Sequence, residues 1–448
     1  MVSSKRYAVA NNHYMADFDP KQKETYLIDL DANNLYGRCM MDFLPVGAFE
    51  FCFISQHLID DILALSAEAE IGYFLEVDLE YPVDLHDWHQ DYPLAPFKCE
   101  KSKKELSPFC QKIVEEQNLK HSVGFTKLMC TLEDREHYVV HYRNLQLYLK
   151  LGLKLKKVHR VLKFKQAPVM KQYITFNSCK RAQAKNDFDS GLYKLLSNSL
   201  YGKTIERADN RTMIKLVHDI QQYEKYASLV TMKSCKVINP ELVSLELKHP
   251  LLKIDKPVYL GTAILELAKF YMYDFHYNVI KPHFADKVRL LYTDTDSLLY
   301  EIECSDVYAH LDTLSDHFDF SNYDQDHVLY SDSNKKVPGC FKDETKGQII
   351  KSFVGLRSKM YAIQMDKKNK ELKAAKGVKK TVIECLRFDD YVQCLKSQES
   401  SHHDFLSIRS EKHKVFTSCQ SKVSLSCFDD KRWILDNGID TVPYGFQS

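Results

Sequence analysis

The chain has 448 residues, 44% of them hydrophobic and 12% aromatic, which is enough for roughly three globular domains of about 150 residues. Its 62 lysines and arginines nearly balance 61 aspartates and glutamates, so any surface that binds nucleic acid must be local. The thirteen cysteines form no C-x-x-C pair, which argues against a zinc ribbon and favours free thiols in a reducing compartment. Neither a signal segment nor a run of ~18 apolar residues is present, so we expect an intracellular protein without a membrane span.

The predicted elements give an α+β protein with a strongly helical middle. In the first part of the chain we expect a polar lead-in (1–24), a short strand (26–30), a helix after Asp31, a strand (71–81), loops (82–130), and a helix followed by a basic strand (138–165). The middle is expected to hold a helix (180–204), an irregular stretch (205–258) with a strand near 212–217, and a long apolar helix (259–280). The last part is expected to hold a strand (290–302), a further strand (350–364), a lysine run (365–380) and a mixed tail.

The stretch LLYTDTDSLLYEI places Asp294 and Asp296 inside an otherwise apolar strand. Side chains alternate along a strand, so both carboxylates are expected on one face, with Thr293 and Thr295 opposite. Two like charges so close are costly to bury. One interpretation is a tight turn, in which Asp, Thr and Ser are common; the other is a site for Mg²⁺, which prefers oxygen ligands.

A further carboxylate follows the strand YLIDL at Asp31. Asp31 is a candidate metal ligand and equally a candidate N-cap for the next helix. Asp29 lies on the same strand face, and we expect it to be a structural acid rather than a spare ligand.

The helical stretch YKLLSNSLYGK carries Lys194, Asn198 and Tyr201 at the spacing i, i+4, i+7, which places them on one face. They could form a polar functional stripe, or Tyr201 could be core and Lys194 solvated. Gly202 could end the helix or allow close approach of a substrate backbone.

Together these segments resemble the family B DNA polymerases, most closely the protein-primed branch of Polinton-type transposons, adenoviruses and phages. Four family motifs occur in the family's order: D-x-x-S-L-Y-P as DANNLYG (31–37), K-x-x-x-N-S-x-Y-G as KLLSNSLYG (194–202), Y-x-D-T-D-S as YTDTDS (292–297) and K-x-Y as KMY (359–361). Asn34, Gly37 and Ser358 depart from common family residues without removing a ligand.

The resemblance implies a right-hand polymerase with an antiparallel palm sheet. Its expected regions are a lead-in (1–24), a first palm segment (25–75), an insertion of the terminal-protein-region type (76–165), fingers (166–206), a second palm segment (207–364) with another insertion within 205–258, and a thumb (365–448). Only 30 residues precede Asp31, so we expect no exonuclease domain before the palm; the D-x-E at 78–80 is expected in an ordinary strand, and His86–His89 in a structural loop.

The resemblance also implies roles for site residues. Asp31 and Asp296 would bridge two Mg²⁺ ions, with Asp294 assisting and the Ala32 carbonyl completing one metal shell. The incoming nucleotide would contact a set of side chains from the first palm motif and the fingers: Tyr36 under the sugar, Lys194 at the triphosphate, Asn198 and Tyr201 at the base pair, and Arg181 and Lys185 as further phosphate contacts.

Lys359 and Tyr361 would hold the primer-template backbone, and Gly202 would also lie near DNA. The lysine run KKNKELKAAKGVKK (367–380), including Lys373 and Lys376, is either a solvated face or the start of a thumb that contacts duplex DNA without sequence preference.

The sequence therefore predicts a DNA-directed DNA polymerase that uses primer-template DNA and deoxynucleoside triphosphates in the nucleus or at a viral replication site, with a terminal priming protein as a further candidate partner. The leading alternative is a truncated transposon- or virus-derived remnant that binds DNA without catalysis. A reverse transcriptase is disfavoured because Thr295 separates the two aspartates, which are adjacent in the Y-x-D-D turn of those enzymes.

Overall fold

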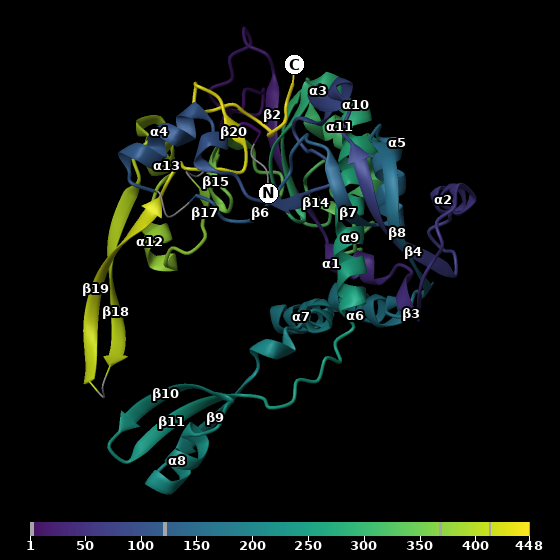
Figure 1. Ribbon diagram of the computed structural model, residues 1–448. Coiled ribbons are helices and arrows are strands. Elements are labelled where there is room, and N and C mark those ends of the chain that lie inside the picture. Colours follow the sequence, from purple (N-terminus) through teal and green to yellow (C-terminus); the bar gives the residue numbers. More distant parts are fainter. Residues whose placement is uncertain (1–3, 120–122, 367–369, 412–413, 448) are drawn as a thin grey trace.

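The computed structural model describes residues 4–119, 123–366, 370–411 and 414–447 (Figure 1). Within these ranges the strands form three four-stranded sheets, one three-stranded sheet and three two-stranded ribbons, all with antiparallel pairing between named strands. Across the same ranges, no helix combines the length and apolar character that a membrane crossing requires.

The central sheet joins strands that lie far apart in the sequence. Its order is β12 (Val288–Asp294), β13 (Ser297–Glu303), β2 (Thr25–Ala32) and β14 (Phe341–Asp343). The predicted strand at 26–30 is confirmed, and the predicted strand at 290–302 is in fact the β12–β13 hairpin. Leu30 and Tyr300 are almost fully buried, and each such side chain stabilises the fold by roughly 1.5–3 kcal/mol.

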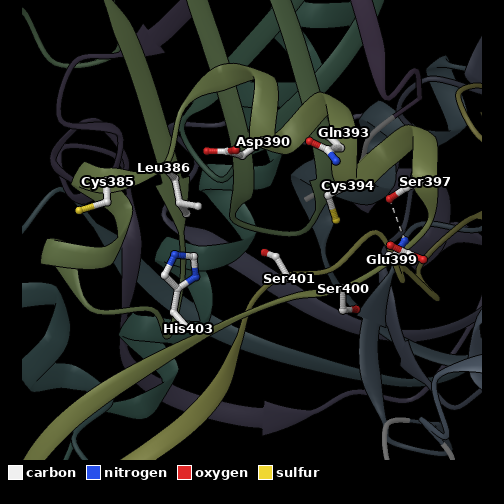
Figure 2. Close-up of a pocket in the computed structure, with 10 residues that line it drawn as sticks. All are labelled: Cys385, Leu386, Asp390, Gln393, Cys394, Ser397, Glu399, Ser400, Ser401 and His403. Atoms are coloured by element: carbon white, nitrogen blue, oxygen red, sulfur yellow. Dashed lines mark hydrogen bonds between the residues drawn. The ribbon is translucent and has the colours of Figure 1, made fainter.

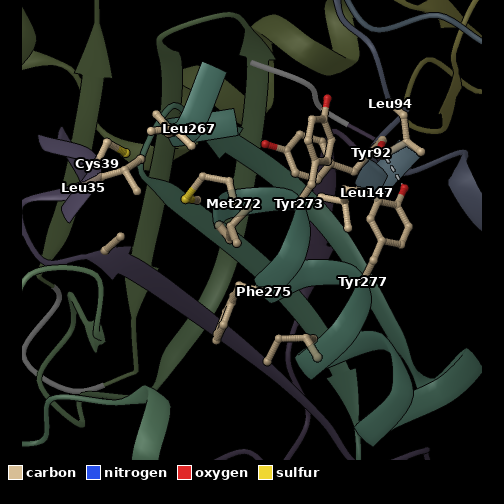
Figure 3. Packing of buried hydrophobic residues seen from close by; sticks show 14 of the residues in the cluster. Leu35, Cys39, Tyr92, Leu94, Leu147, Leu267, Met272, Tyr273, Phe275 and Tyr277 are labelled. Atoms are coloured by element: carbon tan, nitrogen blue, oxygen red, sulfur yellow. Dashed lines mark hydrogen bonds between the residues drawn. The ribbon is translucent and has the colours of Figure 1, made fainter. Parts of the chain in front are cut away.

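One long apolar helix covers this sheet. The predicted helix at 259–280 is confirmed as α9 (Val258–Asp274), which continues as a π-helical segment (Phe275–Ile280) and α10 (Lys281–Phe284). Figure 3 shows Met272, Tyr273 and Phe275 in the same buried cluster as Leu35 and Cys39 of α1 (Leu35–Met40). This packing fixes α1, and therefore the residues that follow Asp31.

A second sheet packs beside the first and has the order β1 (Tyr7–Val9), β15 (Ile350–Arg357), β16 (Met360–Met365) and β17 (Glu371–Ala375). The polar lead-in is therefore not wholly irregular, because β1 pairs with β15. The prediction of one strand at 350–364 is wrong, since a turn with Lys359 at φ +59° divides the segment into a hairpin. Residues 367–369 of the predicted lysine run lie outside the described residues.

The third four-stranded sheet lies toward the right of Figure 1 in the order β3 (Leu44–Phe51), β8 (Lys154–Ala167), β4 (Ile71–Glu80) and β7 (Arg135–His141). The predicted strand at 71–81 is confirmed; the predicted helix of 138–165 begins only after β7. Between β3 and β8 the chain also forms α2 (Gln56–Leu63), α3 (His86–His89), β5 (Phe97–Cys99), α4 (Pro108–Glu116), β6 (Lys127–Met129) and α5 (Tyr142–Lys150). Of these, α4 packs with residues of β15, β16 and α13 (Phe388–Ser397) rather than with this sheet.

Two helices, α6 (Lys171–Gln183) and α7 (Asp187–Thr204), form an antiparallel hairpin below the central sheet in Figure 1. The segment 180–204 is helical as predicted, except that residues 184–186 divide it between the two helices. The stretch expected to be irregular instead forms a small sheet, β10 (Met232–Asn239), β11 (Leu242–Lys248) and β9 (Thr212–Val217), beside α8 (Ile220–Ala227). The strand near 212–217 was predicted, whereas the strands that pair with it were not.

The C-terminal region contains a long hairpin that extends away from the sheets at the left of Figure 1. The hairpin is formed by β18 (Ser401–Glu411) and β19 (Lys414–Leu425). The other elements of the C-terminal region are α12 (Lys380–Cys385), α13 (Phe388–Ser397), β20 (Trp433–Ile434) and β21 (Thr441–Val442). The segment after β19 returns to the N-terminus, where Thr441 N donates to Ser4 O over 3.1 Å. One further helix, α11 (Val307–Thr313), follows β13.

Candidate active site

The tips of two central strands bring Asp31 and Asp296 together. Asp31, near the end of β2, lies beside the start of β13. The β12–β13 hairpin turns through Thr295, whose φ is +64°, and Asp296 N donates to Asp294 O over 2.7 Å. Ala32 N donates to Asp296 O over 2.8 Å, which fixes this turn against the end of β2.

The turn separates the roles of the two aspartates. Strand alternation does not extend across it, so the expectation that Asp294 and Asp296 share a strand face for that reason is wrong. Asp31 and Asp296 line one cavity, whereas Asp294 is absent from its lining. Asp294 Oδ1 instead lies 3.1 Å from Lys359 Nζ. The tight-turn interpretation of this segment is therefore confirmed, and the Mg²⁺-site interpretation stays a prediction.

Burial disfavours the ionised forms of several carboxylates in this region. Burial raises the pKa of Asp31 to about 7, although an ion pair with Lys342 acts in the opposite direction. Burial also raises the pKa of Asp296, and the Asp294 carboxylate adds to the effect. Burial, reinforced by nearby carboxylates, raises the pKa of Asp29 to about 8, which fits the predicted structural acid. Positive charge near such carboxylates stabilises their ionised forms.

The oxygen atoms at this site could provide some, but not all, of the ligands of a hard divalent ion. Asp31 and Asp296 offer carboxylate oxygens and Ala32 a backbone carbonyl, and oxygen is the donor that Mg²⁺ prefers. Among the residues that the structure describes, no three His, Cys, Asp or Glu side chains stand in a preformed metal cluster. Such an ion would therefore need ligands from a bound substrate as well, which is usual for Mg²⁺ in sites that handle nucleotide phosphates.

Two charged residues at this site were missed from the sequence. Lys342 on β14 lies opposite Asp31 on β2, and its Nζ is 2.9 Å from Asp31 Oδ2. The same ammonium pairs with Glu344. The segment CFKDE alternates buried Phe341 and Asp343 with these two charges, a weak strand signal, but a strand of three residues is hard to predict without its distant partner.

The helical hairpin supplies the opposite wall of the cavity. Lys194 and Asn198 of α7 and Arg181 of α6 line it, and the first two share a helix face as predicted. The complete lining combines strand ends, the α1 turn and the two helices: Asp31, Ala32, Asn33, Asn34, Leu35, Tyr36, Arg181, Lys194, Asn198, Asp296 and Lys342. Two carboxylates and three cations thus line one space.

Tyr36 and Tyr201 form the aromatic edge of this site. Their rings stack with centroids 4.3 Å apart and planes 14° from parallel. Tyr36 stands in the first turn of α1, where Asn34, in a left-handed conformation, accepts a hydrogen bond from Gly37 N. Asn34, rather than Asp31, is therefore the N-cap of this helix, so the alternative role for Asp31 is wrong.

Two predicted contact residues lie elsewhere. Lys185 is exposed in the connection between α6 and α7 and does not line the cavity. Gly202 lies inside α7, so it does not end the helix. A Cβ built on Gly202 would meet no atom within 4 Å, so the position is open on the helix surface.

The K-x-Y segment lies next to the aspartates. Lys359 pairs with Asp294, and the Tyr361 ring lies 4.7 Å from that of Tyr292. Lys376 is exposed, and its backbone N donates to Lys359 O over 2.9 Å. Lys373 is half-buried, donates to Leu386 O and pairs with Glu371, so its ammonium already has partners within the chain.

Two other sequence features are structural. The D-x-E at 78–80 lies in β4 as predicted, and Asp78 and Glu80 pair with His159 and with Lys154 and Lys156. His86–His89 forms the short helix α3 rather than a loop, and His89 Nδ1 lies 2.8 Å from the buried Tyr81 hydroxyl.

A separate pocket near the C-terminal hairpin contains none of the predicted site residues (Figure 2). It lies between α13 and the start of β18, with Asp390 and Gln393 on one side and His403 on the other. As at the Asp31 cavity, no three His, Cys, Asp or Glu side chains of the described lining stand together in a way that could hold a metal ion.

Comparison with known proteins agrees with this geometry. The family model described as DNA polymerase type B, organellar and viral, matches residues 19–282. No curated protein matches the chain. The chain spans about three fifths of the phi29 DNA polymerase chains that share its fold.

The phi29 polymerase complex with primer-template DNA and incoming nucleotide substrates has 14% identity and a TM-score of 0.52, covering 95% of this chain and 61% of that one. The post-translocation complex of phi29 polymerase with primer-template DNA has 14% identity and a TM-score of 0.50, covering 94% of this chain and 61% of that one. The orthorhombic crystal form has 13% identity and a TM-score of 0.51, covering 95% of this chain and 62% of that one. Because the family model covers more than half of the sequence and the right-hand polymerase fold covers nearly all of it, this chain belongs to the organellar and viral type B DNA polymerases.

Proposed function

We propose that the chain catalyses template-directed DNA synthesis, adding deoxynucleotides to the 3′-hydroxyl of a primer. The observation that carries the proposal is the single cavity that Asp31 and Asp296 line together with Arg181 and Lys194. Phosphoryl transfer needs little covalent chemistry from the protein; it needs positioning and neutralisation of developing charge. The cavity would provide positioning and charge neutralisation, because carboxylates that could bind metal ions lie on one wall and cations that could bind phosphates lie on the other.

Asp31, Asp296 and the Ala32 carbonyl would hold two Mg²⁺ ions, with Asp294 assisting from beside the cavity. Bound there, divalent ions would lower the pKa of the primer hydroxyl and neutralise charge on the leaving group. The protein's own contribution is to hold the carboxylates rigidly: Ala32 N on Asp296 O fixes the hairpin turn, and β13 fixes the end of β2.

The helical wall would bind the nucleotide. Lys194 and Arg181 would contact the triphosphate, Lys194 as a point charge and Arg181 with a planar fork. The stacked pair of Tyr36 and Tyr201 would lie under the sugar and base, where the Tyr36 ring would exclude a 2′-hydroxyl by contact. Asn198 would face the nascent base pair.

Primer-template DNA would pass Lys359 and Tyr361 on its way to this cavity. In this proposal the central sheet is the palm, α6 and α7 are the fingers, residues 76–165 and the small sheet within 205–258 are insertions, and residues 365–448 are the thumb. A terminal protein would be a candidate primer, as the resemblance to protein-primed polymerases implies, and the protein would act in the nucleus or at a viral replication site.

Primer extension tests the proposal. The wild-type protein with Mg²⁺ should extend a primed DNA template, and Asp296→Asn should abolish extension while retaining DNA binding in fluorescence anisotropy and an unchanged melting temperature. Binding without extension by folded wild-type protein, with Asp296→Asn indistinguishable from it, would support a non-catalytic remnant. Extension on an RNA template in preference to DNA would instead support a reverse transcriptase.

A further inference from the structure

The segment 319–340, called here the linking loop, connects Phe318 to β14 and contacts two walls of the candidate active site. None of its residues was assigned a role from the sequence. Within the loop, Lys336 has a left-handed backbone with φ +55°. This conformation costs free energy in a residue other than glycine and persists only where the surrounding structure holds it. The contacts of Lys336 and of Asp319 show what the loop joins.

The two ends of the linking loop hold the backbone that follows Asp31. Gly339 N donates to Asn33 O over 2.7 Å, and Asn33 N donates to Cys340 O over 2.9 Å. The side chain of Asn33 donates through Nδ2 to Asp319 Oδ2 over 2.6 Å. Asn33 itself lines the cavity. The loop therefore fixes the strand end that carries the proposed metal ligand.

The same loop reaches the last turn of α6. Asp319 Oδ2 also accepts from Lys336 N over 2.7 Å. The ammonium of Lys336 donates to Arg181 O over 3.4 Å. A cation is favourable at this position, because the last carbonyls of a helix carry partial negative charge. One carboxylate, that of Asp319 at 3% exposure, thus connects Asn33 to the residue that holds the end of α6.

The side chain of Arg181 depends on this support. Its Nε is buried and makes no hydrogen bond with the part of the chain that the structure describes. Burial lowers the pKa of Arg181, and the nearby Asp319 carboxylate acts in the opposite direction. An unsatisfied buried donor costs free energy. Because Arg181 lines the cavity, an oxygen of a bound phosphate would supply the missing acceptor.

We propose that Asp319 and Lys336 are positioning residues that hold the end of α6 so that Arg181 can bind the triphosphate of the incoming nucleotide. The inference rests on the proposed polymerase function and deepens it. Neither residue lines the cavity, so Lys336 acts through Arg181, and Asp319 acts through Asn33 and Lys336. Holding Arg181 in place before the nucleotide arrives reduces the ordering cost of binding.

Nucleotide binding without turnover tests the role of Lys336. A primer that ends in a dideoxynucleotide prevents extension, and a fluorescent base analogue in the template reports binding of the next correct deoxynucleoside triphosphate. Lys336→Met should raise the dissociation constant of the triphosphate by roughly three- to tenfold. The affinity for primer-template, measured by fluorescence anisotropy, should not change.

Two further variants separate positioning from a general effect on the loop. Lys336→Arg keeps a cation at the end of α6 and should keep the wild-type dissociation constant. Lys335→Met removes the neighbouring lysine, which pairs with Asp332 at 2.7 Å, and should also match wild type. Equal losses in Lys335→Met and Lys336→Met would overturn the proposal, because any change in the loop would then have the same effect.

A double-mutant cycle tests whether Lys336 acts through Arg181. Arg181→Gln alone should weaken triphosphate binding by roughly tenfold. Adding Lys336→Met to Arg181→Gln should cause no further loss, because the residue that Lys336 positions is already absent. Losses that add in the double variant would overturn the proposal. Asp319→Asn should show the same lack of additivity with Arg181→Gln, and a thermal melt of each variant shows that it is folded; if Asp319→Asn does not fold, the Lys336 cycle decides.

The outcome separates this inference from the polymerase proposal. If wild type binds the triphosphate and extends an unblocked primer while Lys336→Met binds equally tightly, only the positioning role is wrong. If folded wild type neither binds the triphosphate nor extends the primer, the polymerase proposal fails, and this inference fails with it.

Discussion

Lys342 Nζ lies 2.9 Å from Asp31 Oδ2, so an ammonium group already neutralises the carboxylate that we propose as a metal ligand. The two residues face each other across the β2–β14 pair, and Lys342 also contacts Glu344. A divalent ion that binds Asp31 must compete with this ammonium or share the carboxylate with it.

Lys342→Met should therefore strengthen the binding of Mn²⁺ to the free protein. Removing a half-exposed competing ion pair is worth about 1 kcal/mol, or roughly fivefold in the dissociation constant. Electron paramagnetic resonance of free Mn²⁺ measures the constant without DNA or turnover. Lys351→Met, which breaks the exposed pair with Asp17, is the control and should change nothing. Weaker Mn²⁺ binding in Lys342→Met would instead make Lys342 a support for the ligand geometry.

A buried charge network should set the acid stability of the protein. Burial opposes ionisation of Asp42, but Arg143 and Arg38, each 2.7 Å away, outweigh burial and hold the pKa of Asp42 below its usual range. The Tyr271 hydroxyl donates to the same carboxylate over 2.5 Å. The network joins the end of α1 to α5 and α9, so it also supports Tyr36.

Because the folded pKa of Asp42 is lowered, its contribution is fully present above the unfolded value near 3.8 and is lost as the pH falls through the folded value. Asp42→Asn should cost roughly 3 kcal/mol at pH 7, since it leaves buried guanidinium groups unpaired. Urea unfolding at pH 7 and at acid pH measures the difference between variant and wild type. The difference should shrink in acid; the same difference at both pH values would show that Asp42 contributes through packing.

Much of the site was predicted from the sequence through its resemblance to family B DNA polymerases. That resemblance implied that Asp31, Tyr36, Lys194 and Asn198 act together, and the structure places all four in one cavity. Their positions follow from short periodic segments, β2, α1 and α7, whose hydrogen bonds or apolar faces are visible within a few residues.

Long-range pairing was not visible in the same way. β14 has three residues, and its partner β2 lies far away in the sequence. The residues around Lys342 therefore do not indicate that it contacts Asp31. The same reason explains β1, which pairs with β15. Asp296 was identified from its residue type, but the direction of its side chain was predicted wrongly. The left-handed backbone of Thr295, rather than strand alternation, sets that direction.

The triphosphate contact predicted for Lys194 can be isolated from general helix effects. Lys194→Gln should raise the KM for deoxynucleotides by roughly 10- to 100-fold, since a hydrogen bond to a charged group contributes about 1.5–3 kcal/mol. DNA affinity should stay unchanged, because Lys194 is proposed to contact the nucleotide's triphosphate and not the primer-template. Lys180→Gln, on α6 but outside the cavity lining, is the control. A loss of kcat alone, at constant KM, would contradict a binding role for Lys194.

The stacked rings of Tyr36 and Tyr201 should determine sugar selection. Tyr36→Ala removes the ring that lies against Tyr201 with centroids 4.3 Å apart, and it opens space where a 2′-hydroxyl would otherwise collide. Discrimination between deoxy- and ribonucleotides, measured as the ratio of kcat/KM values, should fall by roughly 10- to 200-fold. Tyr36→Phe keeps the ring and should keep the ratio. Equal losses in both variants would point to the hydroxyl group instead, and an unchanged ratio in Tyr36→Ala would place sugar selection on other residues of the cavity.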